Sequence, residues 1–472
     1  MCGIFAVINS DKTFLDVYRG LKMIQHRGQD SCGIGTYDNK FIIKKNQGLV
    51  GNSFSPSDMN LLTGKIGIGH VRYPTIGSGG VVNAQPLFTN TPHGIIMAHN
   101  GNVFNYHELK NKLQKQYKRY INTEVDVEII LNLFAYYLSE TGKTDFDAVC
   151  SAAGRVFEEV KGSYSVIAYI ADVGFVSFRD PRGFRPLIYG EKNGKYAFSS
   201  ESVSLDIIGM ENYRDVRPGE VIFINNSNEL HSRVIAGQKR SSCIFEWVYF
   251  ARPDSTIDSI NVYKARLRLG EKLADEIADK AGNFDVCMPV PDTSRTAALA
   301  CAGRLGIPYR EGLIKNRYIG RTFIMPGSTD RMNAVREKLN PIKAEIENKR
   351  ILLIDDSIVR GNTSKSIVQI VRNAGAEEVH FAVYSPPLRY PCYFGIDMQR
   401  SEEFIANKIE LEDIKNEINA DSLHYLSIEG LIEGVGADNP LGFCNACFSG
   451  NYPVNVDEEH IKNIESDRNM SA

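Results

Sequence analysis

The stretch Arg350-Ile-Leu-Leu-Ile-Asp-Asp-Ser-Ile-Val-Arg-Gly-Asn-Thr-Ser364 decides the fold of the second half of the chain. Its apolar start, residues 350–354, predicts a buried strand, and its last hydroxyl residue opens a helix expected over 364–373, before Gly375. Another strand is expected over 379–384. Strands that alternate with helices indicate a parallel sheet whose ligand lies at the carboxyl ends of the strands.

The residues that precede this stretch continue the alternation. A strand is expected over 284–290 and a helix over 294–305, which stops at Gly306. Another helix is expected over 263–281, because apolar positions recur at helical spacing up to Gly282. The second half of the chain is therefore predicted to be of the α/β class.

The sequence changes character near residue 240. Before it, glycines interrupt short apolar runs at 65–71, 94–98 and 163–169, a pattern typical of strands in an antiparallel-rich region. Two helices are expected between such strands, the clearer over 126–138. The predicted domains are residues 2–238 and 243–435, followed by a carboxyl-terminal segment, residues 436–472.

Composition excludes several classes of protein. The 472 residues suit two or three domains, and 43% hydrophobic with 24% charged residues argue against disorder. A formal net charge of -3 offers no basic excess for nucleic acid, and no apolar run approaches a membrane span, so neither partner is expected. The odd number of cysteines, 9, favours reduced thiols and a cytoplasmic location.

The amino terminus carries a candidate nucleophile. Removal of Met1 would make Cys2 the first residue, with its own α-amino group as a base. That group, with an ordinary pKa of about 7.7 to 8.0, can accept the thiol proton and return it to a leaving amine. The alternative is that a cysteine at the second position has no role. The neighbouring motifs decide between these two interpretations.

Four motifs occur in order over the first hundred residues: Cys2-Gly-Ile-Phe5, His26-Arg-Gly-Gln-Asp30, Gly69-His-Val-Arg-Tyr-Pro-Thr75 and His99-Asn-Gly-Asn102. Together they resemble the glutaminase domain of amidotransferases with an amino-terminal nucleophile. The resemblance implies an αββα Ntn-hydrolase sandwich in which Cys2 attacks the side-chain amide of glutamine and releases ammonia.

Specific residues suit this chemistry. The Asn100 side-chain amide and the Gly101 backbone N–H can stabilise a tetrahedral oxyanion. Arg72 offers a forked cation for the α-carboxylate of glutamine, and Asp126 a carboxylate for its α-amino group. Thr75 is assigned to glutamine binding as well. Singly, such residues usually form a surface ion pair, a turn or a helix cap, so the assignments depend on the whole set.

The acidic pair after residue 354 marks a candidate phosphate site. Asp355 and Asp356 can hold ribose hydroxyls or Mg²⁺, or they can be merely solvated. Gly361 allows close approach of a phosphate, and Thr363 supplies a hydroxyl at a helix N-terminus. The stretch lacks the GK[ST] of a P-loop, so nucleoside triphosphate hydrolysis is not expected.

The same stretch resembles the phosphoribosyl-diphosphate motif of type I phosphoribosyltransferases, which implies a parallel-sheet domain. Residues 315–326 are similar to a loop that closes over the diphosphate, and Pro291-Asp-Thr-Ser294 is similar to a loop that helps hold Mg²⁺. The resemblance implies one Mg²⁺ per subunit, on Thr293, Asp355 and Asp356. The residues that it assigns to phosphoribosyl diphosphate are Lys315, Arg317, Arg321, Asp355, Asp356, Ser357, Val359, Arg360, Gly361 and Thr363.

With both motif sets, the chain resembles the amidophosphoribosyltransferase family from Cys2 through Cys447. The resemblance implies glutamine-dependent amination of 5-phosphoribosyl 1-diphosphate to 5-phospho-β-D-ribosylamine, glutamate and diphosphate, the first committed step of purine biosynthesis. Ammonia would pass inside the protein, with Tyr73 as messenger between the sites. A homotetramer and inhibition by purine nucleotides are further expectations.

The cysteines of the second half suggest a cluster. Cys444-Asn-Ala-Cys447 alone suits redox, zinc and iron–sulfur sites equally. One branch of the family carries a [4Fe-4S] cluster, and Cys243, Cys392, Cys444 and Cys447 match its ligand positions, which implies one structural cluster per subunit. Members of that branch often carry a propeptide, whereas only Met1 precedes Cys2 here, so methionine removal should suffice for maturation.

Two other functions compete with this interpretation. A different amidotransferase with an amino-terminal cysteine could aminate a sugar phosphate or aspartate, but the motif at 355–361 argues against it. A regulatory protein could use the phosphoribosyl fold to sense nucleotides. The net charge of -3 and the lack of a helix-turn-helix pattern argue against that alternative.

Overall fold

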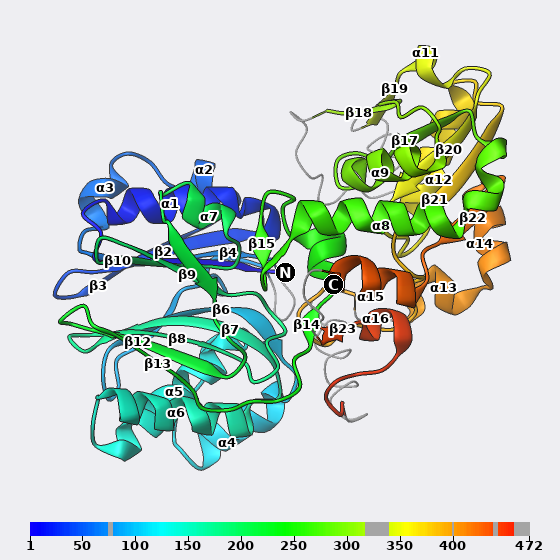
Figure 1. Cartoon of the computed structure of the whole chain (residues 1–472). Coiled ribbons are helices and arrows are strands. Elements are labelled where there is room, and N and C mark those ends of the chain that lie inside the picture. Colours follow the sequence, from blue (N-terminus) through cyan, green and yellow to red (C-terminus); the bar gives the residue numbers. More distant parts are fainter. Residues whose placement is uncertain (74–78, 317–338, 399–400, 438–441, 457–472) are drawn as a thin grey trace.

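The computed structural model describes residues 1–73, 79–316, 339–398, 401–437 and 442–456. Within these ranges, none of the helices combines the length and hydropathy that crossing a membrane requires. The amino-terminal part and the α/β part lie side by side, and both meet near residue 1 (Figure 1).

Two antiparallel sheets form the amino-terminal part. The first has the order β11-β9-β10-β1-β4-β2-β3, from β1 (Gly3–Ile8), β2 (Ser31–Tyr37), β3 (Phe41–Gln47), β4 (Ile66–Arg72), β9 (Ile188–Lys192), β10 (Lys195–Ser199) and β11 (Asn212–Asp215). The second has the order β13-β12-β8-β7-β6-β5, from β5 (Leu87–Thr89), β6 (Ile95–Val103), β7 (Gly162–Ile170), β8 (Gly174–Arg179), β12 (Glu220–Asn225) and β13 (Leu230–Val234). Apolar side chains of both sheets, including Ile4, Ile68, Ile167 and Phe198, are buried together.

Helices cover the outer face of each sheet (Figure 1). The first sheet is covered by α1 (Thr13–Met23), α2 (Val50–Ser53), α3 (Asp58–Leu61) and α7 (Val203–Asp206), and the second by α4 (Tyr106–Lys115), α5 (Val127–Thr141) and α6 (Phe146–Glu159). The predicted αββα sandwich is confirmed. The prediction of only two helices is wrong, because α1 and α4 are also regular helices. In α4 the buried positions are only Tyr106, Leu109 and Leu113, too few to reveal its period among polar neighbours.

The second half contains a parallel sheet of order β17-β20-β21-β22, from β17 (Val286–Pro289), β20 (Arg350–Asp355), β21 (Glu378–Val383) and β22 (Ser422–Tyr425). The longer helices of this half are α8 (Val262–Glu276), α9 (Arg295–Leu305), α12 (Asn362–Asn373), α14 (Leu411–Ile418) and α15 (Ile428–Gly436). The predicted alternation and parallel sheet are confirmed, and α9 ends at a left-handed Gly306, as expected.

The predicted end of the helix at residue 281 is wrong. The Ile277 N–H bonds to the carbonyls of both Leu273 and Ala274, and the chain continues as a 3₁₀ segment, η3 (Ala278–Asn283). This shared bond tightens the last turn of α8, so the helix ends at Glu276 before the glycine is reached. The helix α12 begins two residues before its predicted start at Ser364.

Short elements complete the structure: η1 (Gln25–Arg27), β14 (Ser242–Cys243), η2 (Glu246–Phe250), β15 (Thr256–Ile257), β16 (Ile260–Asn261), β18 (Leu313–Lys315), β19 (Leu339–Pro341), α11 (Lys343–Ile346), η4 (Ser401–Glu403), α13 (Ile405–Lys408), β23 (Phe443–Cys444) and α16 (Ala446–Ser449). The segment η2 is a single π-helical turn.

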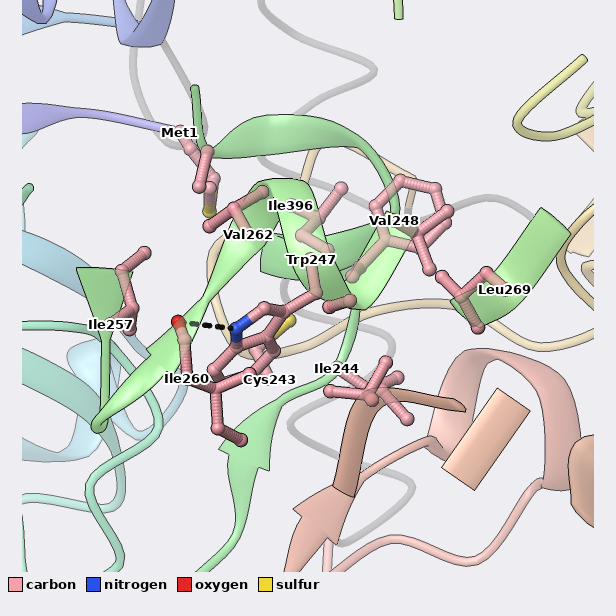
Figure 2. Packing of buried hydrophobic residues seen from close by; sticks show 14 of the residues in the cluster. Met1, Cys243, Ile244, Trp247, Val248, Ile257, Ile260, Val262, Leu269 and Ile396 are labelled. Atoms are coloured by element: carbon pink, nitrogen blue, oxygen red, sulfur yellow. Dashed lines mark hydrogen bonds between the residues drawn. The ribbon is translucent and has the colours of Figure 1, made fainter. Parts of the chain in front are cut away.

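Trp247 lies at the centre of the junction between the two halves. Its indole N–H donates to the Ile260 carbonyl at 3.4 Å (Figure 2). Met1 and Ile396 belong to the same buried cluster, and the exposed fraction of Met1 is only 2%. The chain terminus is therefore enclosed at the place where the two halves meet.

Candidate active site

Cys2 directly precedes β1, a central strand of the first sheet, and lies beside the end of β4. The pairing of Gly3 with Val71 places Cys2 next to Arg72. The Tyr73 N–H donates to the Cys2 sulfur at 3.5 Å, and the thiol lies 3.5 Å from the Tyr73 carbonyl. The first and third predicted motifs are therefore joined at the candidate nucleophile.

Burial and nearby charges set the proton affinity of this site. Burial raises the pKa of the Cys2 thiol, whereas the chain terminus, the Tyr73 N–H and Arg72 oppose that rise, and Asp126 adds to it. Burial also lowers the pKa of the Met1 α-amino group to about 5. The Met1 amine is therefore mostly neutral at pH 7.

The strand β6 supplies the candidate oxyanion donors. The exposed fraction of Asn100 is 1%, and its side-chain nitrogen has no hydrogen-bond partner within the described ranges. A buried amide without a partner is costly unless a ligand completes it, so this nitrogen suits an oxyanion. At Gly101 a Cβ atom would lie 1.9 Å from the Ser163 carbonyl oxygen, so only glycine fits there.

Two side chains assigned to glutamine are buried near Cys2. Asp126 precedes α5 and accepts the Val103 N–H at 2.9 Å, while its other oxygen lies 3.3 Å from the His99 ring. Arg72 is buried and lies 3.3 Å from Asp30. Both side chains influence the pKa of Cys2, so the three share one environment. Thr75 lies outside the described residues, and the glutamine-binding roles stay predictions.

The acidic pair lies at the carboxyl end of β20. Ser294 donates to Asp355 at 3.3 Å, and the Asp356 N–H donates to the same carboxylate at 2.9 Å. Burial first, and the neighbouring Asp356 second, raise the pKa of Asp355 well above its usual range. Burial raises the pKa of Asp356 to about 6, against the opposing charge of Arg266.

These oxygen donors fit a hard cation. Two adjacent buried carboxylates repel each other, and a divalent ion would relieve that repulsion. The Thr293 side chain borders the same cavity and can add a hydroxyl. No group of three or more His, Cys, Asp or Glu in the described ranges could hold an ion alone, so an ion bound here would need further oxygen ligands.

The loop between β20 and α12 forms the wall of this site. Gly361 has a φ of 79° and directly precedes α12, so the first N–H groups of that helix face the loop. The residues of this wall that border the cavity are Ser357, Val359, Arg360, Gly361, Asn362, Thr363 and Ser364. Lys315 also borders it, 3.4 Å from Asp292. Arg317 and Arg321 lie outside the described residues.

A cavity of about 820 Å³ extends from the acidic pair to Met1 and Tyr73, which lie next to Cys2 and Arg72 in the chain. Met1, His26, Arg27 and Tyr73 border it on the amino-terminal side, and Asp355, Asp356 and the phosphate loop on the other. Sequence reasoning missed Arg266, which lines this cavity. The sequence did contain a signal for this residue, because Arg266 lies in the apolar stripe of the predicted helix. A charged side chain at such a position needs buried hydrogen-bond partners.

Four cysteines converge near the junction. Cys243 pairs with Cys444 between β14 and β23, and the Cys447 carbonyl accepts the N–H groups of Arg389 and Tyr390, close to Cys392 in sequence. All four are buried free thiols. Burial raises the pKa of Cys447 well above its usual range, and the other three thiols raise it further.

The donor set of this site is purely thiol, which suits an iron–sulfur cluster. Each thiolate of a [4Fe-4S] cluster binds a different iron, so the sulfurs stand further apart than around a single ion. Burial raises the pKa of the Cys243 thiol to about 11, against the opposing charge of Arg185.

Comparisons with known proteins agree with this geometry. A glutamine amidotransferase domain matches residues 77–206, and a phosphoribosyl transferase domain matches residues 256–387. Amidophosphoribosyltransferases of Haemophilus influenzae and Escherichia coli strain K12 are each 44% identical, over 100% of this chain and 97% and 96% of theirs. The chain belongs to the amidophosphoribosyltransferase family.

Similarity to the family extends to yeast and to solved structures. The Saccharomyces cerevisiae amidophosphoribosyltransferase is 39% identical over 100% of this chain and 96% of its own length. The structure of glutamine phosphoribosylpyrophosphate amidotransferase from B. subtilis, in complex with ADP and GMP, is 39% identical, with a TM-score of 0.86 over 97% of this chain and 98% of that one.

Membership of the amidophosphoribosyltransferase family confirms the predicted enzyme class and function. The chain is an enzyme of purine biosynthesis that aminates 5-phosphoribosyl 1-diphosphate with nitrogen from glutamine. The alternatives, an amidotransferase with another acceptor and a nucleotide sensor, are thereby set aside.

Proposed function

We propose that this amidophosphoribosyltransferase produces ammonia at Cys2 and consumes it beside Asp355 and Asp356. The observation that carries the proposal is the cavity that extends from Asp355 and Asp356 to Met1 and Tyr73, beside Cys2. Ammonia released into bulk water at neutral pH would be mostly protonated and no longer nucleophilic. An internal route to the acceptor keeps it reactive.

The glutaminase step uses groups of the amino-terminal part. Once Met1 is removed, the α-amino group of Cys2 accepts the thiol proton, and the sulfur attacks the side-chain carbonyl carbon of glutamine. Asn100 and the Gly101 N–H stabilise the resulting oxyanion. The proton then passes to the departing nitrogen, ammonia leaves, and water hydrolyses the thioester to glutamate. Arg72, Thr75 and Asp126 orient the amino acid.

The acceptor step uses the phosphate loop. Ammonia attacks C1 of phosphoribosyl diphosphate, the C1–oxygen bond breaks, and diphosphate departs. Asp355, Asp356 and Thr293 would hold one Mg²⁺ per subunit, which offsets the charge of the leaving diphosphate. The residues proposed to hold the substrate itself are Lys315, Arg317, Arg321, Asp355, Asp356, Ser357, Val359, Arg360, Gly361 and Thr363.

A [4Fe-4S] cluster on Cys243, Cys392, Cys444 and Cys447 is proposed as a structural group, one per subunit. The convergence of the four buried thiols supports it. Bound there, the cluster would fasten the carboxyl-terminal segment to the junction. After anaerobic purification, the wild type should hold equal amounts of iron and sulfide, and a Cys444→Ser variant should lose both. A wild type without iron would refute this part of the proposal.

The remaining proposals concern the location, the inhibitors and the assembly of the enzyme. The nine free cysteines support a reducing, cytoplasmic location. Purine nucleotides are proposed as feedback inhibitors, since the B. subtilis enzyme was solved with ADP and GMP. A homotetramer is the proposed assembly.

Stoichiometry tests the coupled reaction. Glutamate and diphosphate should be released in equal amounts, and only when glutamine, phosphoribosyl diphosphate and Mg²⁺ are all present. If glutamate were released at the same rate without phosphoribosyl diphosphate, Cys2 could still be the nucleophile, but the two reactions would not be coupled. If protein that lacks Met1 released no glutamate at all, the proposed role of Cys2 as the nucleophile would be wrong.

A further inference from the structure

Four charged side chains are buried together between the two halves. Arg27 and Glu201 come from the amino-terminal part, as does Arg185, and Glu246 begins η2 of the second half. We name these four residues the junction ion group. The Arg27 guanidinium lies 2.6 Å from Glu201 and 2.8 Å from Glu246, and Arg185 lies 3.5 Å from Glu246. All four side chains are at most 1% exposed, so two positive and two negative charges balance away from water.

Arg27 also holds the candidate nucleophile. Its Nε–H donates to the Cys2 carbonyl oxygen at 3.1 Å, while its Nη2 donates to both oxygens of Glu246, at 2.8 and 3.1 Å. A guanidinium is planar and rigid, so a shift of one bonded partner is passed to the others. The backbone position of Cys2 is therefore tied to a carboxylate of the acceptor half.

The segment 246–255 faces the acceptor side. Tyr249, Phe250, Ala251, Arg252 and Pro253 border the shared cavity. The Arg252 N–H and the Ser255 hydroxyl donate to Glu201 at 3.0 and 2.8 Å, respectively. One face of this segment thus contacts the cavity and the other the junction ion group.

Arg266 connects this segment to the acidic pair. It donates to the carbonyls of Trp247, Tyr249 and Ala251, at 2.9, 3.1 and 2.8 Å. Its charge reaches Asp356, and its side chain borders the cavity. The turn that it holds is π-helical, a rare form that occurs mostly at functional sites.

We infer that Arg27 is a positioning residue for Cys2, and that Glu246 sets its position according to the occupancy of the acceptor site. Phosphoribosyl diphosphate in the cavity contacts the face of segment 246–255 that Arg266 holds. Glu246 and Glu201 then fix Arg27, and Arg27 fixes the Cys2 carbonyl. The inference rests on the proposed function, because it requires Cys2 to be the nucleophile.

The substitution Glu246→Gln tests the link between Glu246 and Arg27, because glutamine has nearly the same shape as glutamate. Glutamine keeps one oxygen for the Arg27 Nη2 but loses the negative charge and the second accepting oxygen. The measurement is kcat/KM for glutamine with and without phosphoribosyl diphosphate and Mg²⁺, on the full chain with its metal sites loaded. We expect the ratio of the two values to fall by about tenfold or more. The release of diphosphate with ammonium chloride should stay within about twofold of wild type, since Glu246 does not border the cavity.

Asp258→Asn is the matched control. Asp258 forms a buried ion pair with Arg179 at 2.8 Å at the same junction, but neither side chain borders the cavity or bonds to Cys2. It should lose stability while keeping the ratio of kcat/KM values. The double variant Arg27→Lys/Glu246→Gln should lose no more of this ratio than the more impaired single variant, because both act through one path.

Labelling of Cys2 by an electrophilic glutamine analogue gives a second readout. In the wild type, phosphoribosyl diphosphate should accelerate labelling, and in Glu246→Gln it should not. Unchanged acceleration in Glu246→Gln, or an equal loss in Asp258→Asn, would overturn the inference. Cys2→Ala separates the two proposals, because glutamate release by that variant would refute the nucleophile itself.

Discussion

Replacement of Asn100 by alanine tests the oxyanion role most directly. The side-chain nitrogen of Asn100 is buried and has no partner among the described residues, so its removal breaks no hydrogen bond from that nitrogen to any of them. The substitution should therefore destabilise the transition state rather than the resting enzyme. Loss of one such donor costs about 2.7 to 4 kcal/mol, which corresponds to a fall of kcat by about 100- to 1,000-fold.

Glutamate release at saturating phosphoribosyl diphosphate and Mg²⁺ is the assay. The KM for glutamine should change only a few-fold, because the donor acts mainly after the sulfur attacks. Diphosphate release driven by ammonium chloride should remain near the wild-type rate. Asn132→Ala is a suitable control, since Asn132 is also buried but bonds to the Glu128 carbonyl at 2.9 Å within α5. This control should lose stability and keep its glutaminase turnover.

Two results would refute the reasoning. If Asn100→Ala kept more than about a third of its turnover, the nitrogen would not be a donor to the oxyanion. If the ammonia-driven reaction fell as far as the glutaminase reaction, the residue would have a structural role instead.

Three further predictions address other parts of the molecule. Cys2→Ala should release no glutamate yet should still form diphosphate with ammonium chloride, and loss of both activities would contradict the separation of the two steps. Gly101→Ala would place a Cβ atom 1.9 Å from the Ser163 oxygen and should strongly lower the thermal unfolding midpoint, whereas Gly303→Ala, with no atom within 4 Å, should leave it unchanged or raise it. Burial lowers the pKa of His424 to about 4, so the unfolded chain binds the extra proton between that value and about 6.5, and stability should fall as pH falls through this window. His424→Gln should reduce the drop in urea midpoint between pH 7 and pH 5, and an unchanged drop would show that other groups cause it.

Local patterns predicted much of this molecule from its sequence. The strand that ends in Asp355 and Asp356 combines an apolar run with a loop and a helix start, all within fifteen adjacent residues. The motifs around Cys2 and Asn100 are equally compact. Each predicted element depends on neighbours in the chain, so periodicity and residue type suffice to find it.

The contacts across the junction could not be predicted in this way. Arg27 and Glu246 are separated by 219 positions, and nothing near either residue specifies the other. Arg266 was visible only as a charged residue on an apolar helix face. Its three carbonyl partners become apparent once η2 folds against α8.

The enclosure of Met1 has a consequence for how the enzyme is made. With an exposed fraction of 2%, this residue is covered by side chains from both halves of the folded chain. An aminopeptidase binds the terminal residue, so we expect it to act on the nascent chain, before the two halves close. Under the proposed role of Cys2, a chain that folded with Met1 in place would lack the α-amino base of the glutaminase step, although its acceptor site would be complete.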